Sequence, residues 1–280
     1  MGDLDVVLLG TGSPLPDPNR AGPSSLVRAE GLIILVDAGR GVVMRLAGAG
    51  VIPPFINAIL LTHLHSDHIC DLNDVITTHW VMSPVTTPLT VYGPPGTQQV
   101  IDGLLEMLAP DISYRIAHHA DLDSGPDVRV VEVVPGESFL VGSATVLVGA
   151  TNHAPVEPTV GYRISANGVD VVMGGDGVPC VGLDALVAGA DAYVQTVIRE
   201  DLVKLVPRQR FQDILDYHST VPDAVATAGR GGVRHLILTH YVPAPPLGQY
   251  DEWRALASEF PGEVHLGDDL TVIEISRAGS

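Results

Sequence analysis

The sequence predicts an α/β fold, and two observations lead to this prediction. Apolar runs of strand length alternate along the chain with segments that have the apolar spacing of helices. Several of the apolar runs end in a histidine or an aspartate, so polar side chains lie on the loops that follow strands. Strands interrupted by helices, with functional groups on such loops, are typical of layered α/β architectures.

The predicted strands, in chain order, are Asp5–Leu9, Ser25–Arg28, Leu32–Asp37, Ala58–Thr62, Leu89–Tyr92, Val128–Val134, Thr145–Gly149, Thr159–Ile164, Asp170–Met173, Ala192–Thr196, Leu236–Thr239 and Leu270–Ile275. Most are rich in Val, Ile and Leu, which suit buried strands. The predicted helices are Gly41–Ala49, Ile69–His79, Thr97–Leu108, Leu183–Ala188, Arg210–Tyr217, Pro222–Ala228 and Tyr250–Glu259. Asn167-Gly168 favours a two-residue turn, which predicts a hairpin between the strands on either side.

The segment Leu60–His68, with the sequence LLTHLHSDH, is the strongest functional signal in the chain. His63 and His65 are two residues apart, so on an extended backbone they point to the same side. Ser66 and Asp67 are good helix N-caps, so the chain is expected to turn there into a helix. That turn brings Asp67 and His68 to the same volume. Imidazole and carboxylate together form a ligand set for zinc or a similar metal.

Three later strands also end in a residue that can bind a metal. Val146–Gly149 leads to His153, Val171–Met173 leads to Asp176, and the run that begins at His235 ends in His240. A single histidine at a strand end is usually an ordinary polar residue. The three together, in addition to the first motif, predict a metal site built from four strand ends.

The His-x-His-x-Asp-His motif and the three later strand ends resemble the metallo-β-lactamase superfamily over nearly the whole chain. The resemblance implies an αββα sandwich of two mixed sheets flanked by helices. It also implies a dizinc centre, with manganese or iron as alternatives, and a homodimer. Its ligands would be His63, His65 and His153 for one metal, Asp67, His68 and His240 for the other, and Asp176 as the bridge.

The ligand types indicate the hydrolytic branch of that superfamily. His65 stands where the iron-binding oxidoreductases carry Glu, which disfavours redox iron, and Asp176 stands where some zinc β-lactamases carry Cys. The implied chemistry is a metal-activated hydroxide, because metals lower the pKa of bound water. Asp67 is expected to hold or deprotonate this nucleophile in addition to ligating metal.

Two further stretches resemble tRNase Z and the related zinc arylsulfatases. The opening Leu9–Pro14 and its following prolines resemble their N-terminal loop, although the same residues also fit an ordinary Gly/Pro turn. Tyr217-His218-Ser219-Thr220 resembles their His-Ser-Thr motif. By this resemblance His218 is the candidate general acid or oxyanion stabiliser; a histidine at a helix end is the alternative interpretation.

Two departures from the tRNA enzymes argue against tRNA processing. Those enzymes carry a long arm between the third-motif histidine and the bridging aspartate, whereas His153 and Asp176 are only 23 positions apart in the sequence. Thr196 also stands where the family carries the glutamate that orients the catalytic histidine. His218 is therefore expected to lack that partner unless another acid, such as Glu200, replaces it.

The charge of the chain leads to the same expectation. It has 33 acidic and 15 basic residues, a formal net charge of −18. Nucleic-acid binding depends on Lys and Arg that neutralise phosphates. We therefore expect a small-molecule ester as the partner and no nucleic acid, because the metal centre itself is locally positive and can attract a small anion.

Composition adds weaker expectations. Residues 1–280 are expected to form a single domain, because 46% hydrophobic content can fill one large core and no linker is apparent. The two cysteines do not suggest a disulfide framework, which favours a reducing cytoplasm. The N-terminal residues do not show the charged and apolar regions of a signal peptide, and no run of 18 apolar residues is present, so neither secretion nor a membrane association is expected.

Together these patterns predict a cytoplasmic dizinc hydrolase of a small ester. The bond could belong to a sulfate ester, phosphodiester, lactone or thioester, and the sequence does not choose among them. Two alternatives remain open. One is a tRNase Z-type 3′-end endoribonuclease, and the other is a ligand-binding protein with a vestigial metal site.

Overall fold

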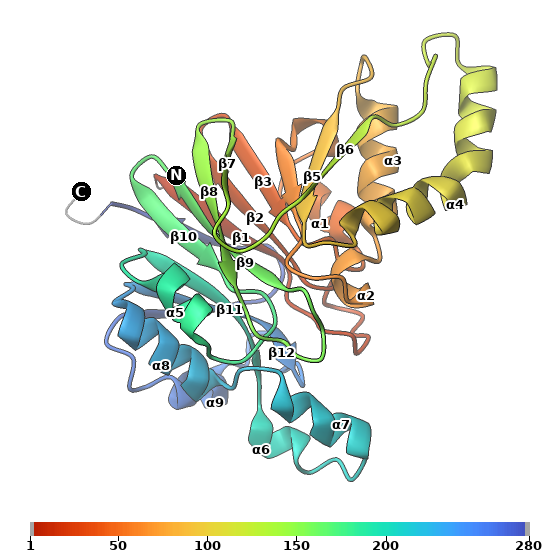
Figure 1. The fold of residues 1–280 in the computed structure, drawn as a ribbon. Helices are drawn as coiled ribbons and strands as arrows, with labels where there is room; N and C mark the ends of the chain where they lie inside the picture. The colour runs from red at the N-terminus through yellow and green to blue at the C-terminus, as the bar shows by residue number, and fades with distance from the viewer. Residues whose placement is uncertain (1–2, 278–280) are drawn as a thin grey trace.

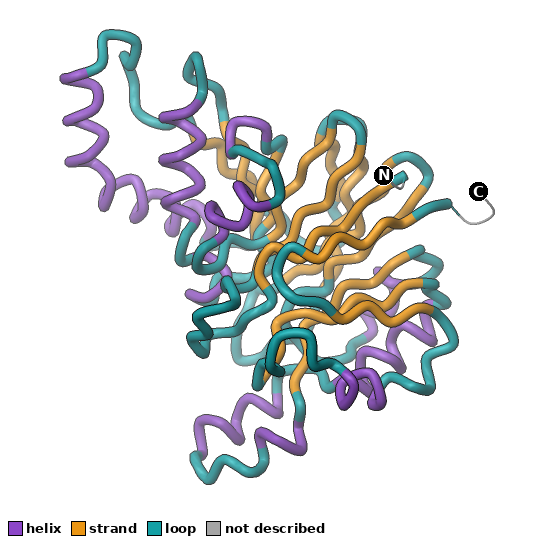
Figure 2. The backbone as a smooth tube through the Cα atoms, turned by 180° about the vertical axis from the view of Figure 1, so that it is seen from behind, coloured by secondary structure: helices purple, strands orange, loops and turns teal. Residues whose placement is uncertain are grey.

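The structure, a computed structural model, describes residues 3–277. Two seven-stranded sheets pack face to face, and helices cover their outer faces (Figure 1). The same layers are visible from behind in Figure 2. The predicted α/β fold with two mixed sheets flanked by helices is confirmed.

The first sheet has the strand order β14-β1-β2-β3-β4-β5-β6. Its strands are β1 (Leu4–Gly10), β2 (Ser24–Ala29), β3 (Leu32–Val36), β4 (Ala58–Leu60), β5 (Leu89–Gly93), β6 (Val128–Glu132) and β14 (Thr271–Ile275). Strands β14 to β3 pair antiparallel, whereas β3 to β6 pair parallel. The parallel strands therefore place their carboxyl ends at one edge, where the predicted ligands begin.

The second sheet has the order β13-β12-β11-β10-β9-β8-β7. Its strands are β7 (Ser138–Val141), β8 (Ala144–Ala150), β9 (Val160–Ala166), β10 (Val169–Met173), β11 (Ala192–Ile198), β12 (His235–Val242) and β13 (Glu263–Leu266). Strands β10 to β13 are parallel, so β10 and β12 also end at a common edge. The predicted hairpin is present, with β9 and β10 antiparallel around the turn at Asn167-Gly168.

The alternation of side chains along each strand divides the core into layers. In β1, Leu4, Val6 and Leu8 face the other sheet, whereas Val7 and Leu9 face the helices. All five are buried, because the strand is covered on both faces. This two-sided burial explains why most of the central strands have nearly continuous apolar sequences.

The helices are α1 (Val42–Gly48), α2 (Ser66–Ile69), α3 (Leu72–Met82), α4 (Thr97–His118), α5 (Val181–Val187), α6 (Glu200–Val203), α7 (Gln209–Asp213), α8 (Val221–Gly231) and α9 (Asp251–Leu256), with 3₁₀ turns at Pro53–Phe55 and Ile214–Asp216. Helices α1 and α3 contribute to the core outside the first sheet, and α5, α8 and α9 to the core outside the second. Helices α6 and α7 project away from the sheets (Figure 1). Within residues 3–277, no helix is long and apolar enough to cross a membrane.

Several predicted boundaries were wrong. The helix expected at Ile69 begins at Ser66, with His65 as its N-cap, and is interrupted before Leu72. Helix α4 continues past Leu108 to His118 and contains Pro110, and it bends along its length in Figure 1. A proline inside a helix removes one hydrogen bond and can kink the helix instead of ending it. Strands β7 and β13 were missed because both are only four residues long.

Candidate metal centre

The predicted ligands meet at one edge of the sandwich, where four strands deliver them. His63, His65, Asp67 and His68 follow β4, and His153 follows β8. Asp176 follows β10, and His240 lies near the end of β12. The seven side chains form two adjacent groups, and within each group the ligand atoms lie within 4.8 Å of one another. The first group consists of His63, His65, His153 and Asp176, and the second of Asp67, His68 and His240.

In the first group, three imidazole nitrogens face one another. His65 Nδ1 lies 3.1 Å from His63 Nε2 and 3.2 Å from His153 Nε2. The other nitrogen of His153 is fixed, because Nδ1 donates to the carbonyl of Tyr217 at 2.8 Å. This contact leaves Nε2 of His153 unprotonated in the neutral ring, the form in which it can bind a metal.

The second group surrounds two carboxylates. His240 Nε2 lies 3.3 Å from Asp67 Oδ2 and 3.5 Å from Asp176 Oδ2. His68 Nε2 lies 3.4 Å from the same Asp176 oxygen. That oxygen is also 3.9 Å from His63 Nε2 in the first group. Asp176 therefore lies between the two groups, where a bridging ligand would have to be.

The two groups differ in electrostatics. Burial, together with the neighbouring His68, lowers the pKa of His63 well below its usual value, and burial lowers the pKa of His153 to about 4. Burial also disfavours protonation of His68, but the carboxylates of Asp176 and Asp37 outweigh it and raise the pKa of His68 well above its usual value. The carboxylates of Asp37 and Asp176 therefore place negative charge at the position where a bound cation would be favourable.

Unpartnered buried atoms test whether these residues fit a metal. Among residues 3–277, His68 Nε2, Asp176 Oδ1 and His240 Nδ1 are buried and have no hydrogen-bond partner. Such atoms are rare in folded proteins because leaving a buried polar group unpaired costs about 1–3 kcal/mol. Two of these three atoms, His68 Nε2 and Asp176 Oδ1, belong to side chains that meet at the centre. The donor set therefore fits a divalent metal.

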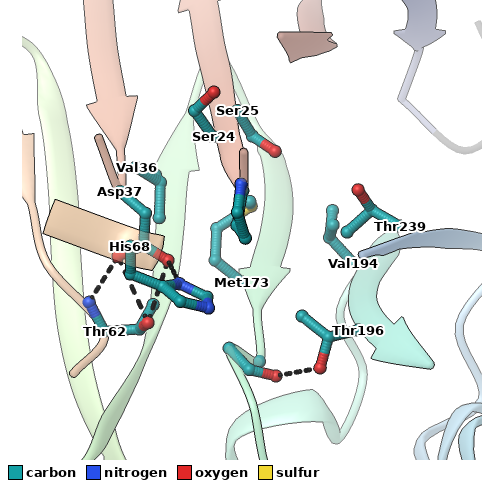
Figure 3. Close-up of a pocket in the computed structure, with 13 residues that line it drawn as sticks. Ser24, Ser25, Val36, Asp37, Thr62, His68, Met173, Val194, Thr196 and Thr239 are labelled. Carbon is teal, nitrogen blue, oxygen red and sulfur yellow. Dashed lines mark hydrogen bonds and ion pairs between the residues drawn. The ribbon is translucent and has the colours of Figure 1, made fainter. Parts of the chain in front are cut away.

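Asp37 is a functional residue that the sequence analysis missed. Its carboxylate accepts from His68 Nδ1 at 2.8 Å and from the backbone and hydroxyl of Thr62 (Figure 3). The contact fixes the tautomer of His68 and leaves Nε2 free to face the centre. Asp37 directly follows the apolar run Leu32–Val36. The strand-end rule that selected Asp176 would also have selected Asp37.

A tightly packed glycine loop places Asp176. Gly175 has φ +67°, and a Cβ there would lie 2.8 Å from Thr62 Cβ. Gly177 has φ +153°, and a Cβ there would lie 2.6 Å from the carbonyl oxygen of Asn152. Only glycine combines this backbone with so close an approach. The loop is further held by Thr196, whose hydroxyl donates to the carbonyl of Gly175 at 3.0 Å (Figure 3).

His240 reaches the centre through a local backbone distortion. It has φ +53°, a left-handed conformation that is uncommon for residues other than glycine. The neighbouring β11–β12 pairing shifts register between Thr196 and Ile198. Strain of this kind tends to occur at functional sites, where the surrounding packing enforces it.

His218 also lies at the centre, but it contacts a carboxylate other than the one expected. Its Nε2 lies 3.3 Å from Asp176 Oδ2, and its Nδ1 lies 3.0 Å from the carbonyl of Ile214. Thr196 instead supports the glycine loop, and Glu200 is exposed and pairs with Lys204. The carbonyl of Ile214 therefore orients the ring of His218, in place of the acid that was expected to do so.

A cavity of about 340 Å³ opens over the centre. Its polar wall consists of His65, Asp67, Asp176, His218 and His240. The opposite wall comes from the N-terminal loop, at Ser13, Pro14 and Leu15, and from the α7 region, at Arg210, Phe211, Ile214 and Tyr217. A second cavity of about 30 Å³ adjoins His68, and its lining includes the side chains of Asp37, Thr62 and Thr196 as well as apolar residues (Figure 3).

Comparison with known proteins identifies the family. A family model described as a beta-lactamase superfamily domain matches residues 33–241. The chain belongs to the metallo-β-lactamase superfamily. It is 54% identical over 275 residues to a Ribonuclease Z of Mycolicibacterium paratuberculosis, covering 97% of this chain and 98% of that protein. It is 52% identical, again over 97% of this chain, to a Ribonuclease Z of Mycobacterium bovis.

Solved structures of the superfamily share the fold. The short form of human tRNase Z superposes with a TM-score of 0.71 at 24% identity, covering 97% of this chain and 99% of that one. The chain is accordingly a metallo-β-lactamase-fold hydrolase, as its sequence predicted, and its cluster of His and Asp side chains indicates a metal-dependent enzyme. The identity and number of its metals remain predictions.

The expectation of a small-molecule ester partner and no nucleic acid was wrong. Relatives that share more than half of their residues with this chain over nearly its whole length are named Ribonuclease Z. The net charge misled because charges separated by more than about 8–10 Å are largely screened at physiological salt. The total of −18 is a sum over the whole chain, and it does not describe the potential at the cavity.

Proposed function

We propose that this metallo-β-lactamase-superfamily hydrolase is a tRNase Z-type endoribonuclease, which cleaves a phosphodiester bond near the 3′ end of precursor tRNA. The observation that carries the proposal is the 54% identity to a Ribonuclease Z over 97% of the chain. The centre supports it, because His and Asp ligands arranged in two adjacent groups suit phosphodiester hydrolysis.

The residues of the centre divide the catalytic tasks. His63, His65 and His153 would hold one divalent metal, Asp67, His68 and His240 a second, and Asp176 would serve both. Bound metals would supply Lewis acidity and lower the pKa of a water molecule towards neutrality. Zinc is the metal that this ligand set suits best, with manganese as the alternative.

Two side chains can move protons in this arrangement. The Asp67 carboxylate lines the cavity and can hold the attacking water. His218 lines the same cavity and can donate a proton from Nε2 to the departing ribose oxygen, because its Nδ1 is occupied by the carbonyl of Ile214.

The RNA must lie partly outside the cavity. At about 340 Å³ the cavity is at the small end of ligand pockets, so only the scissile region of an RNA can enter. The structure has a hairpin, and no arm, between His153 and Asp176. Instead, the segment 199–217, which contains α6 and α7, projects from the sheets (Figure 1) and contributes Arg210, Phe211, Ile214 and Tyr217 to the cavity wall.

Charge on this projection suits an RNA strand. Arg208 and Arg210 are exposed, and within residues 3–277 neither side chain has an ion pair or a hydrogen bond. Most other basic side chains are neutralised, for example Arg163 by Asp170 and Arg230 by Asp184. Arg210 and the adjacent Phe211 line the cavity. An arginine that can contact a phosphate next to a ring that can stack on a base is typical of single-strand recognition.

The test is cleavage of a precursor tRNA that carries a 3′ trailer, using the purified chain with zinc or manganese. We expect endonucleolytic release of the trailer, and we expect the Asp176→Ala variant to release none. A parallel panel of small aryl sulfate, phosphodiester, lactone and thioester substrates provides the comparison. Turnover of one of these esters without any cleavage of precursor tRNA at physiological salt would overturn the proposal.

A further inference from the structure

Two histidines outside the metal centre lie together at the opposite end of the second sheet. His235 begins β12, and His265 lies in β13, the edge strand that pairs with it. The parallel register places His235 opposite Glu263 and Ile237 opposite His265. Side chains two residues apart on a strand share a face, so His235, Glu263 and His265 all lie on one face of the sheet.

Their donor atoms are close enough to share one ion. His235 Nδ1 lies 3.1 Å from His265 Nε2 and 3.6 Å from Glu263 Oε2, and the last two atoms are 3.7 Å apart. Two nitrogens bound to a tetrahedral zinc lie about 3.3 Å apart, because Zn–N bonds are about 2.0–2.1 Å long. The three separations are therefore close to those expected for three ligands of a single zinc ion.

We propose that His235, Glu263 and His265 form a further zinc site, separate from the metal centre. Two imidazoles and a carboxylate are a donor set that zinc accepts, and three protein ligands leave one position for water. The site would tie the edge strand β13 to β12. It is independent of the metal centre, since five residues of strand separate His235 from His240, or about 16 Å at about 3.3 Å per residue.

The surroundings favour the form of histidine that binds metal. Burial lowers the pKa of both His235 and His265, so both rings are neutral at pH 7. Glu263 is the exposed member, with 72% of its side chain accessible, and supplies the negative charge. The alternative explanation of this geometry is a direct hydrogen bond between the two imidazole rings, which would need no metal.

Zinc stoichiometry tests the proposal. The full-length wild type and the variants His265→Gln, Glu263→Gln and His119→Gln are stripped with a chelator, reloaded with zinc, desalted and analysed by mass spectrometry. His119 is an exposed histidine remote from both clusters and serves as the matched control. We expect His265→Gln and Glu263→Gln to bind one zinc fewer than wild type and control. Turnover of a small phosphodiester should be unchanged in all four proteins.

A stability readout supports the same test. Zinc should raise the melting temperature of wild type and His119→Gln more than that of His265→Gln, because only the former gain the link between β12 and β13. Equal zinc content in all four proteins would overturn the proposal and leave the hydrogen bond between the rings. A difference that appears only at millimolar free zinc would also overturn it. Because the test compares the zinc content of the variants with that of wild type, its result does not depend on how many metals the metal centre holds.

Discussion

Removal of Arg208 and Arg210, of which Arg210 lines the cavity, tests how an acidic chain can bind RNA. Neither Arg208 nor Arg210 has an ion-pair partner among the described residues. Each substitution in the double variant Arg208→Ala/Arg210→Ala therefore removes an uncompensated positive charge. A phosphate contact on a single strand contributes about 0.7 to the slope of log affinity against log salt. Two contacts therefore contribute about 1.4.

That slope has a measurable consequence. Between 50 and 200 mM salt, a slope difference of about 1.4 corresponds to a factor of about seven. Wild type should therefore lose about sevenfold more affinity for precursor tRNA over this range than the double variant. The assay is fluorescence-anisotropy binding of precursor tRNA to the catalytically inactive Asp176→Ala background.

The control is Arg115→Ala/Arg129→Ala, which changes the net charge equally. Arg115 pairs with Asp111 on α4, and Arg129 is exposed on β6, and neither lines the cavity. Equal salt slopes for wild type, variant and control would refute the role assigned to Arg208 and Arg210. If wild type does not cleave precursor tRNA at all, the proposed function itself fails, and the two failures are distinguishable.

Three further predictions concern the centre. Reconstituted protein should hold two active-site metals, with His63→Ala losing one and Asp176→Ala disturbing both; no more than one active-site equivalent in folded wild type would contradict the dinuclear arrangement. His218→Ala should slow hydrolysis of esters with poor leaving groups by about 10²-fold, near the lower end for general acids, and leave activated nitrophenyl esters unaffected; an equal loss across a leaving-group series would assign His218 to binding. Gly175→Ala should lower the denaturant midpoint and the metal content together, because its φ of +67° and the contact with Thr62 leave no room for Cβ; unchanged values would refute this packing argument.

The strand-end pattern found most of the centre because its ligands are coupled to local sequence. His63, Asp176 and His240 each follow an apolar run that can be recognised without any knowledge of its neighbours. Asp37 satisfied the same rule and was missed, because no family motif drew attention to it. The hairpin at Asn167-Gly168, and with it the absence of an arm, was also readable, since the turn chemistry of that dipeptide is local.

The sequence also misled where a total over the chain was used in place of the positions of individual side chains. A net charge of −18 gave no indication that Arg163 and Arg230 are paired with carboxylates whereas Arg208 and Arg210 are not, because ion pairing depends on which side chains meet in space. The same holds for His235 and His265, which are 30 residues apart and meet only because β12 and β13 pair in parallel.

By itself, then, the sequence determined the αββα fold, the family and the candidate ligands, because apolar periodicity and strand-end residues are properties of short segments. Only the tertiary structure decided which atoms face one another. It gave His218 the carbonyl of Ile214 as a partner, assigned Thr196 to the loop of Asp176, and set Arg210 in the wall of the cavity. The contacts of Thr196 with Gly175 and of His218 with Asp176 join segments 21 and 42 residues apart, and their geometry follows from the packing of two sheets and the loops at their common edge.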